Sequence, residues 1–556
     1  MSEQNSQLTS LAERYLARHL TRGQFLREAA AIGVSATVAG TFLEACSSSP
    51  AKSKPHVSRT LRYGPAPDWL NYDTPTNPAD YPLPPYNMIF EGLTTFKPGT
   101  WQIVNLLADT IEPSSDGTSY NFVLKKGITF QGGYGEMTAA DVKFSFERAA
   151  GIQKLYANAG KSNTTTSGPD WTGLDEVKVT GKYSGQVIFK KPFVPFTTLT
   201  LPWNTSSWIV PQKAVEKLGK SFSTKPVGTG PYELTSYTRN TEMVLNYFKD
   251  YAGAAKAIIP SYDFDEVRFS LTSQTATPTG EALTVPLRAG AVDFTPYLSA
   301  LDVKQLAGSP NISVYSFPQN IDYNLIFVNV QNPKLKDIRV RQALRYAIDI
   351  PAIITVANEK QNSRAYSVIA PGILGNWAGA PHYQRDVGKA KALLHQAGVS
   401  SLDLTLAITA ASSELSTTIG ELIQSNFKDA GIKLTINTNP PNNYTTDPNI
   451  GELYYTEYGG APDPYYQLEW YTCSQVKTWN WSFWCNQQYS RMFAELTTVS
   501  DPTKRAQLAV KMQQLMDQSA GFIWVYYGVA HYASRSNIKP AFTAAGYPDL
   551  RLFKAV

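Results

Sequence analysis

The stretch ELSTTIGELIQSNFKDAG, residues 414–431, followed directly by IKLTINT, residues 432–438, decides the fold class of this chain. The first part is typical of a helix that ends at Gly431, because glycine is a common stop residue at a helix C-terminus. The second part alternates apolar and polar residues with the period of a strand. A helix followed at once by a strand indicates an α/β architecture.

The same order recurs on both sides of this stretch. Toward the C-terminus, DPTKRAQLAVKMQQLMDQ, residues 501–518, has an N-capping aspartate and a proline at the first helical position, and the buried-strand pattern FIWVYYG, residues 522–528, follows it. Upstream, DIRVRQALRYAID, residues 337–349, predicts another amphipathic helix. Further strands are predicted at YNFVLKK, QVIFKK, MVLNYF and LIFVNV. We therefore predict an α/β, or mixed α+β, fold.

Length and charge narrow the function classes. The chain has 556 residues, more than one hydrophobic core usually serves, so we expect two or three domains. It is 43% hydrophobic and 17% charged, a globular composition. Its net charge is +5, with basic and acidic residues interspersed. A nucleic-acid binder needs a basic stripe that is missing here, so that class is excluded.

The N-terminal region has the pattern of an export signal. Four arginines in residues 1–28 precede the weakly apolar run AAAIGVSATVAGTF, residues 29–42, which is shorter than the roughly 20 residues of a membrane span. LEAC, residues 43–46, resembles a lipobox, in which Cys46 would carry the lipid. We predict an export signal over residues 1–45 and a flexible, lipid-anchored tether over residues 46–58.

Two export routes stay open. TRGQFLR, residues 21–27, resembles a twin-arginine motif, but Gly23 stands where the second arginine belongs, and the general secretory route fits as well. The alternative to an export signal is that residues 1–45 form an amphipathic helix that packs on the protein. An exported lipoprotein lies outside the cytoplasm, anchored to the cell membrane on its periplasmic side or at the cell surface.

The two remaining cysteines, Cys473 and Cys485, lie in YTCSQVKTWNWSFWCNQQY. Two nearby cysteines in an exported protein predict a disulfide. Closing a loop of this length stabilises a fold by roughly 3 kcal/mol. A redox or metal pair is the alternative, but the CxxC spacing and a neighbouring histidine are both missing.

Eight segments of the chain occur in an order that indicates its family. They are YNMIFEGLTTF, IEPSSDGTSYNFVLKKGITFQGG, MTAADVKFSFERA, PVGTGPYEL, LNYFKDYAG, LRAGAVDF, DIRVRQALRYAID and APDPYYQLEWY. In this order, through most of residues 60–535, the chain resembles the family-5 extracellular solute-binding proteins, the peptide- and nickel-binding group of ABC importers. No single segment is specific, whereas the ordered set is.

The resemblance implies a two-lobed fold of the type II periplasmic-binding-protein class with an extra inserted subdomain. We expect the first lobe to combine residues 59–88, 226–312 and 521–556. Residues 89–225 would form the insertion and residues 313–520 the second lobe. The solute would lie between the lobes, which close by a hinge motion.

The resemblance also implies where a solute binds. Peptide-binding members use a carboxylate, three residues before the aspartate of a "DP" pair, to hold the ligand's amino terminus. Here the pair is Asp463-Pro464, and the earlier position is Gly460. Glu457 is the nearest acidic substitute. Asp463 is either a turn-forming residue or a ligand contact, and Asn329 either a ligand contact or a strand-end structural residue.

Aromatic residues crowd the region after this pair. Tyr458 and Trp470 are the expected wall of a ligand pocket, although some of the group must be core. The eleven aromatic residues of this region are Tyr454, Tyr455, Tyr458, Tyr465, Tyr466, Trp470, Tyr471, Trp479, Trp481, Phe483 and Trp484.

The predicted function is the substrate-binding component of an ABC transporter. It would capture a small polar solute, peptides above all, and deliver it to a permease and its ATPase. Alternatives are an oligosaccharide or other non-peptide solute, a nickel chelate, and a surface sensor or adhesin without transport. The sequence lacks GxSxG, HExxH and phosphate-loop motifs, so we predict no catalytic residues, no cofactor and no protein metal site. We expect a monomer.

Overall fold

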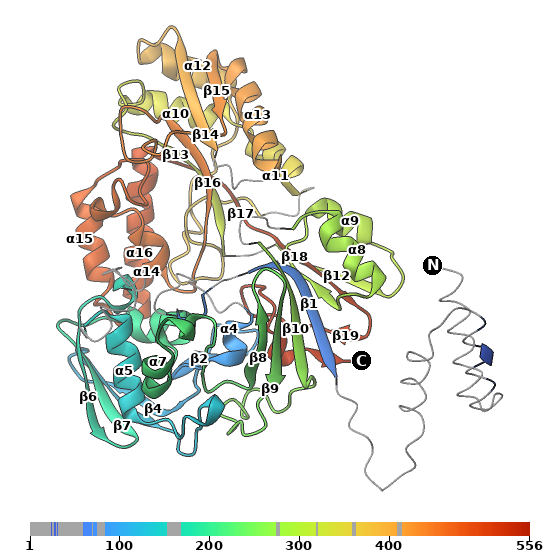
Figure 1. Cartoon of the computed structure of the whole chain (residues 1–556). Coiled ribbons are helices and arrows are strands. Elements are labelled where there is room, and N and C mark those ends of the chain that lie inside the picture. Colours follow the sequence, from blue (N-terminus) through green and yellow to red (C-terminus); the bar gives the residue numbers. More distant parts are fainter. Residues whose placement is uncertain are drawn as a thin grey trace. The chain divides into compact units, whose positions relative to one another are not determined.

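The computed structural model describes residues 24, 27–28, 31, 59–68, 71–74, 84–152, 168–273, 278–318, 321–358, 363–408 and 414–556. The chain divides into two units, residues 1–58 and Arg59–Val556, and the fold below is that of the second (Figure 1). Cys46 and the predicted tether lie outside the described residues, as does nearly all of the export signal. Across the described parts of the chain, no helix is long and apolar enough to span a membrane.

A seven-stranded sheet forms the first lobe, in the order β12-β18-β11-β1-β10-β9-β8. Strand β1 pairs in parallel with β10 and β11, whereas β18 is antiparallel to both β11 and β12. The carboxyl ends of β1, β10, β11 and β12 therefore share one edge. The strands are β1 (Thr60–Pro67), β8 (Tyr232–Thr238), β9 (Glu242–Tyr247), β10 (Glu266–Thr272), β11 (Phe294–Thr295), β12 (Ile312–Phe317) and β18 (Ala530–Arg535); helices α8 (Glu281–Ala289) and α9 (Ala300–Leu306) pack on it.

A five-stranded sheet forms the second lobe, in the order β15-β14-β16-β13-β17. Its strands are β13 (Tyr323–Val328), β14 (Leu402–Ile408), β15 (Ile432–Asn437), β16 (Leu453–Tyr458) and β17 (Phe522–Tyr527). Helices α10 (Ile338–Ala347), α11 (Ile350–Asn358), α12 (Val387–Gln396) and α13 (Glu414–Asp429) share its core, and α14 (Pro464–Glu469), α15 (Gln487–Leu496) and α16 (Pro502–Ser519) complete the lobe. The helix and strand predicted at residues 414–438 are thus confirmed as α13 and β15.

The inserted subdomain is built on a four-stranded sheet, β4-β5-β7-β6. Its strands are β4 (Ala108–Pro113), β5 (Ser119–Leu124), β6 (Leu174–Gly181) and β7 (Ser184–Phe189), next to the hairpin of β2 (Thr94–Phe96) and β3 (Ile103–Asn105). Its helices are α5 (Ala139–Ala149), α6 (Leu201–Trp203), α7 (Gln212–Leu218) and the π-helix η5 (Phe196–Thr200). Helix α4 (Tyr86–Ile89) leads into the subdomain, and a short ladder of β19 (Ile538–Lys539) and β20 (Lys554–Ala555) ends the chain.

The chain crosses between the two large sheets twice. Strand β12 runs on to Phe317 in the first sheet before β13 begins the second, and β17 belongs to the second sheet. The expected boundaries at residues 312 and 521 were therefore wrong by one strand each. The apolar run of β17 predicts a buried strand, but nothing in its pattern says which of two buried sheets it joins.

Candidate functional site

Asp322 lies where the chain enters the second sheet and gathers three other segments around it. Its Oδ1 accepts the N–H of Gly460 at 2.9 Å. The hydroxyl of Tyr547, in the C-terminal loop, donates to both carboxylate oxygens at 3.2 and 3.0 Å. The backbone carbonyl of Asp322 accepts the N–H of Gly528 at 2.7 Å. Asp322 thus stands at both crossings between the lobes, a position that sequence reasoning did not find.

Glu457 lies beside it at the end of β16. In the antiparallel pairing of β13 and β16, Glu457 is opposite Asn324. The buried Asn324 donates from Nδ2 to Glu457 Oε2 at 3.2 Å and accepts the hydroxyl of Tyr455 at 3.0 Å. Tyr455 also bonds the hydroxyl of Tyr526 at 3.1 Å. This network fixes the amide and so orients the glutamate.

The environment of Glu457 favours its neutral form. The side chain is open to solvent, yet protein encloses it closely enough that loss of solvation raises its pKa to about 7, with the charge of Asp322 adding to the shift and the Asn324 hydrogen bond opposing it. Among the described residues, no lysine, arginine or histidine forms an ion pair with Glu457. An accessible carboxylate next to a second acid is a site that a cation would stabilise.

Gly460 is required by its backbone surroundings. A Cβ at this position would lie 2.0 Å from the carbonyl oxygen of Ile321, far inside contact distance. Residue 460 can therefore carry no acidic side chain, although the family resemblance places the ligand-binding carboxylate at this position. The position supplies its N–H to the carboxylate of Asp322, which directly precedes β13.

Asp463 has a structural role. Only 2% of it is exposed, and both its oxygens bind the guanidinium of Arg505 at 2.8 Å. It also accepts the N–H of Tyr465 at 2.9 Å as the N-cap of α14, and the hydroxyl of Thr198 at 2.6 Å. These partners occupy both oxygens of Asp463, which favours the turn-forming role over a ligand contact.

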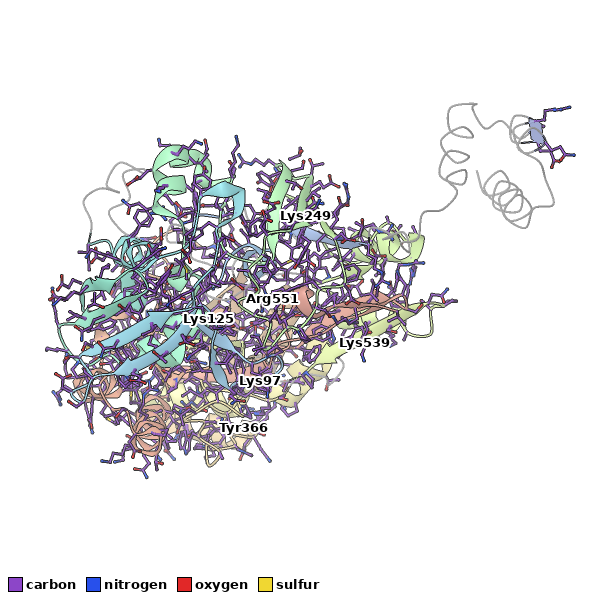
Figure 2. All side chains as sticks on the ribbon, turned by 90° about the horizontal axis from the view of Figure 1, so that it is seen from below. Lys97, Lys125, Lys249, Tyr366, Lys539 and Arg551 are labelled. Atoms are coloured by element: carbon purple, nitrogen blue, oxygen red, sulfur yellow. A yellow bond between two sulfur atoms is a disulfide. The ribbon has the colours of Figure 1, made fainter. Side chains whose placement is uncertain are left out.

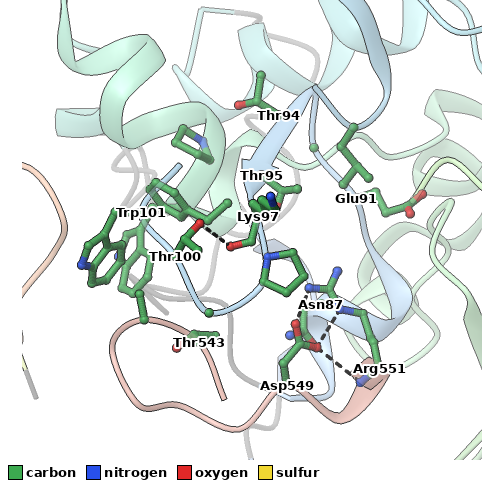
Figure 3. Close-up of a pocket in the computed structure, with 18 of the residues that line it drawn as sticks. Asn87, Glu91, Thr94, Thr95, Lys97, Thr100, Trp101, Thr543, Asp549 and Arg551 are labelled. Atoms are coloured by element: carbon green, nitrogen blue, oxygen red, sulfur yellow. Dashed lines mark hydrogen bonds and ion pairs between the residues drawn. The ribbon is translucent and has the colours of Figure 1, made fainter. Parts of the chain in front are cut away.

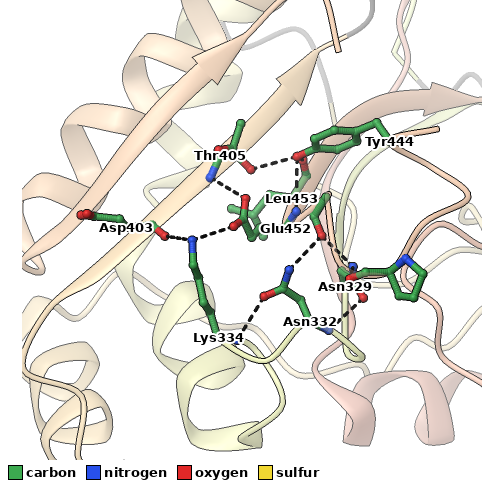
Figure 4. Close-up of polar contacts among 10 residues, drawn as sticks. Asn329, Asn332, Lys334, Asp403, Thr405, Tyr444, Glu452 and Leu453 are labelled. Carbon is green, nitrogen blue, oxygen red and sulfur yellow. Dashed lines mark hydrogen bonds and ion pairs between the residues drawn. The ribbon is translucent and has the colours of Figure 1, made fainter. Parts of the chain in front are cut away.

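Asn329 lies at the opposite end of β13 from the acids, and its amide is committed to the backbone (Figure 4). Its Nδ2 donates to the carbonyls of Pro448 and Gly451 at 2.8 and 2.6 Å. Its Oδ1 accepts the N–H groups of Gln331 and Asn332. Every polar atom of the Asn329 side chain thus holds a loop in place, which favours its strand-end structural role.

The aromatic residues divide between core and surface. Tyr458 is buried at 8% exposure, and its hydroxyl donates to the carbonyl of Trp479. Trp470 is half-buried, with its ring 5.2 Å from Tyr466 and 5.6 Å from Trp479, and Trp479 itself is exposed. Tyr458 thus belongs to the core, while Trp470 and Trp479 present apolar surface.

The predicted disulfide between Cys473 and Cys485 is present and closes the loop that carries Trp479. The cross-link joins the start of this loop to the residues just before α15. It limits the freedom of the indole rings, which is the arrangement that a preformed pocket wall needs.

The first lobe contributes Tyr297, which directly precedes α9 and follows β11. Its backbone is left-handed, with φ of 61°, a conformation that is costly for a tyrosine. The ring is 42% exposed, yet the surrounding protein removes enough solvent to raise its pKa to about 12. Because β11 and β12 end at the same edge, Tyr297 lies on the edge from which the chain crosses to Asp322.

A separate cavity of about 50 Å³ lies between the inserted subdomain and the C-terminal loop of the first lobe, and none of the residues predicted as ligand contacts lines it (Figure 3). Its wall includes Glu91, which is 1% exposed, accepts the hydroxyl of Tyr251 at 2.7 Å, and has a pKa raised by burial to about 7. Arg551, paired with Asp549, and Lys97 also line it, and both cations are visible from below (Figure 2). Within the described ranges, no three histidine, cysteine or acidic residues cluster as metal ligands would.

Comparison with known proteins gives a consistent result. Residues 102–479 match the bacterial extracellular solute-binding proteins, family 5 Middle. The Dipeptide-binding protein of Escherichia coli K12 is 26% identical over 477 residues, covering 82% of this chain and 86% of that protein. The Glutathione-binding protein GsiB of the same strain is 26% identical over 440 residues, covering 76% and 80%.

Solved structures share the fold. The periplasmic binding protein DppA of Helicobacter pylori, in complex with the peptide STSA, has a TM-score of 0.73 at 24% identity, covering 89% of this chain and 97% of that one. A dipeptide-binding protein of Pseudoalteromonas sp. SM9913, in complex with Met-Leu, has a TM-score of 0.75 at 20% identity, covering 90% and 100%. The predicted type II periplasmic-binding-protein fold is confirmed by these similarities.

Proposed function

We propose, from the premise that this chain belongs to the family 5 bacterial extracellular solute-binding proteins, that it captures peptides with a free amino terminus and delivers them to an ABC importer. Members of the family bind solutes without transforming them, so the chain is a transport component and not an enzyme. What it binds is the proposal, and it depends on the acids between the two sheets.

One observation carries the choice of ligand. Glu457 is accessible, has no ion-pair partner among the described residues, and lies beside Asp322. Two neighbouring carboxylates repel each other, and a primary ammonium bound between them would remove that cost while donating up to three hydrogen bonds. The amino terminus of a peptide is such a group. The two acids thus replace the one that Gly460 excludes.

The remaining surfaces agree with a peptide. Trp470 and Trp479 offer apolar area for side chains, and Tyr297 offers a ring from the first lobe. Related proteins are described with dipeptides, with glutathione and with the peptide STSA. A non-peptide amine is the second candidate, since one structure of the same fold holds mannopinic acid.

The proposed working cycle follows from the two crossings. The chain passes between the lobes after β12 and again between β17 and β18, and the lobes would rotate about these crossings to enclose the solute. Anchoring through a lipid on Cys46, with residues 46–58 as tether, would keep the protein near its permease. The rotation of the lobes is proposed from the two crossings, and the lipid anchor from the sequence.

The test is isothermal titration of the full chain with Met-Leu and with N-acetyl-Met-Leu. The free dipeptide should bind and the acetylated one should lose at least tenfold in affinity, because acetylation removes the charge that the acids recognise. Equal affinity for both would reject the ammonium site. Native mass spectrometry of the gently purified protein would then identify any solute that it carries.

A further inference from the structure

The inserted subdomain moves with the first lobe, because buried contacts join the two. The Nε2 of Gln131, 2% exposed, lies within hydrogen-bond distance of the carbonyls of Ile89, Gly230 and Tyr232 at 3.2, 2.9 and 2.7 Å. A Cβ on Gly228 would lie 2.1 Å from the carbonyl oxygen of Ile89. Any contact from the subdomain to the second lobe therefore links the two halves that a hinge would separate.

Such a contact exists at the segment 193–198. The hydroxyl of Thr198 donates to Oδ2 of Asp463 at 2.6 Å. The N–H of Val194 donates to the carbonyl of Thr497 at 2.8 Å. The ring of Phe193 meets that of Tyr465 edge-on, with centroids 5.6 Å apart. Two hydrogen bonds and one aromatic contact thus cross to the second lobe from this segment, and a side-chain hydrogen bond between Tyr465 and Thr172 crosses beside them.

The acceptor is unusually rigid. Asp463 holds Arg505 through two 2.8 Å bonds, and Arg505 is 1% exposed and also donates to the carbonyl of Leu496. Contacts with α14 and α16 therefore hold the Asp463 carboxylate in place without any contribution from the inserted subdomain. A fixed, desolvated charge makes a stronger hydrogen bond than a mobile one in water.

The donor lies on a distorted helix. Thr198 belongs to the π-helix η5 (Phe196–Thr200), which begins after Pro195. A π-helical turn is rare and is found chiefly at functional sites. The hydroxyls of Thr197 and Thr198 both lie 3.4 Å from the carbonyl of Val194, within their own segment, and of the two only Thr198 also donates to Asp463.

We propose that Thr198 is a positioning residue whose bond to Asp463 latches the inserted subdomain onto the second lobe and holds the lobes closed over the solute. The purpose of the latch rests on the proposed function. Its existence does not, because the bond joins the lobes whatever the solute is. Asp463, expected from sequence to touch the ligand, would thus retain it from outside the pocket.

The test is hydrogen exchange at the amide of Val194, measured by mass spectrometry on the full chain without added solute. This amide is bonded across the interface and exchanges only when the lobes part there. Thr198→Val keeps the shape of the side chain and removes the donor, and it should speed exchange about tenfold. Thr198→Ser, which restores a hydroxyl, and Thr197→Val, the matched control, should stay within twofold of the wild type.

Two outcomes would overturn the latch. Wild-type exchange in Thr198→Val would mean that the bond does not hold the lobes together. Faster exchange throughout β5 and β7 as well would mean that the bond only stabilises the subdomain. Neither outcome depends on Met-Leu binding, so failure of the latch and failure of the proposed peptide function remain distinguishable.

Discussion

The N–H of Gly460 donates a 2.9 Å hydrogen bond to Oδ1 of Asp322, and this bond joins the loop after β16 to the crossing between the lobes. Gly460 cannot carry an acidic side chain, but this bond places its N–H against the carboxylate of Asp322, which directly precedes β13. Glu457, three residues earlier, completes the pair. The acidic character of the site is thus kept while the residues that provide it change.

Removing the charge of Glu457 should weaken peptide capture. Glu457→Gln keeps the hydrogen bond to Asn324 but abolishes half of the acid pair, so the dissociation constant of Met-Leu at about pH 7.5 should rise about tenfold or more. Titration calorimetry measures the change. Glu176→Gln, at an exposed position of β6, is the control and should leave affinity unaltered. Equal affinities in the two variants would remove Glu457 from the site.

Peptide affinity should also depend on pH. The pKa of Glu457 is raised to about 7, so the carboxylate forms as the pH rises through neutrality. The amino terminus of a peptide has a pKa of about 7.7–8.0, so more than half of it is still protonated at about pH 7.5. Binding of Met-Leu should therefore strengthen severalfold between pH 6 and pH 7.5. Glu457→Gln should flatten this dependence, and a wild-type curve that stays flat would contradict it.

Glu91 should make folding stability fall with rising pH. Burial raises its pKa from 4.5 to about 7, so the folded state binds this proton more tightly than the unfolded state does. The stabilisation is complete below about pH 4.5 and is lost as the pH rises through 7, amounting to a change on the order of 3 kcal/mol.

Chemical denaturation between pH 5 and pH 8 measures this effect. Glu91→Gln should remove the part of the downward slope that Glu91 contributes, while Glu457, whose pKa is also raised to about 7, still contributes its own part. Glu136→Gln is the control of opposite sign: its pKa is lowered to about 2, mainly by the hydrogen bond from Lys182, so it should not alter the slope in this range. A wild-type slope that survives in Glu91→Gln would assign the effect to another group.

The disulfide should be worth several kcal/mol. Cys473→Ser opens a loop with a sequence separation of 12, which should lower the free energy of unfolding by roughly 3 kcal/mol. Urea denaturation measures the loss, and reductant should have little further effect on the variant. Cys46→Ser should unfold like the wild type. Two reactive thiols at Cys473 and Cys485 in the unreduced, unfolded protein would contradict the cross-link.

The two adjacent glycines of the loop should respond differently to alanine. A Cβ on Gly460 would lie 2.0 Å from the Ile321 carbonyl, whereas one on Gly459 would lie 3.8 Å from Asp322 Oδ1. Gly460→Ala should push the loop away from Asp322, destabilise the protein by about 1–3 kcal/mol and weaken Met-Leu binding. Gly459→Ala should do neither. Thermal unfolding and calorimetry distinguish them, and similar behaviour of the two variants would refute the close approach.

Patterns local in sequence predicted local structure correctly. The helix stop at Gly431 and the alternation after it correspond to α13 and β15, and the cysteine pair forms its disulfide. The cap at Asp501 and the proline after it begin α16. Each of these depends on interactions within one turn of helix or one short loop, so a single segment carries all the necessary information.

Residue roles at the site depended on partners far along the chain. Asp463 finds Arg505, 42 positions away, and Thr198, 265 positions away, which turned an expected ligand contact into a fixed structural charge. Asn329 bonds carbonyls 119 and 122 positions away. Asp322 has no flanking motif at all and matters because two crossings and two loops converge on it.

By itself the sequence determined the family, the two-lobed α/β fold and the stapled aromatic loop, because these follow from hydrophobic period, capping residues and the order of motifs. The sheet that β17 joins, and which of the three acids is accessible and which is buried in an ion pair, depend on the tertiary structure. A carboxylate is chemically the same at residues 322, 457 and 463. Whether it meets solvent, a backbone N–H or a guanidinium is set by groups brought together through folding, and that environment determines what it can bind.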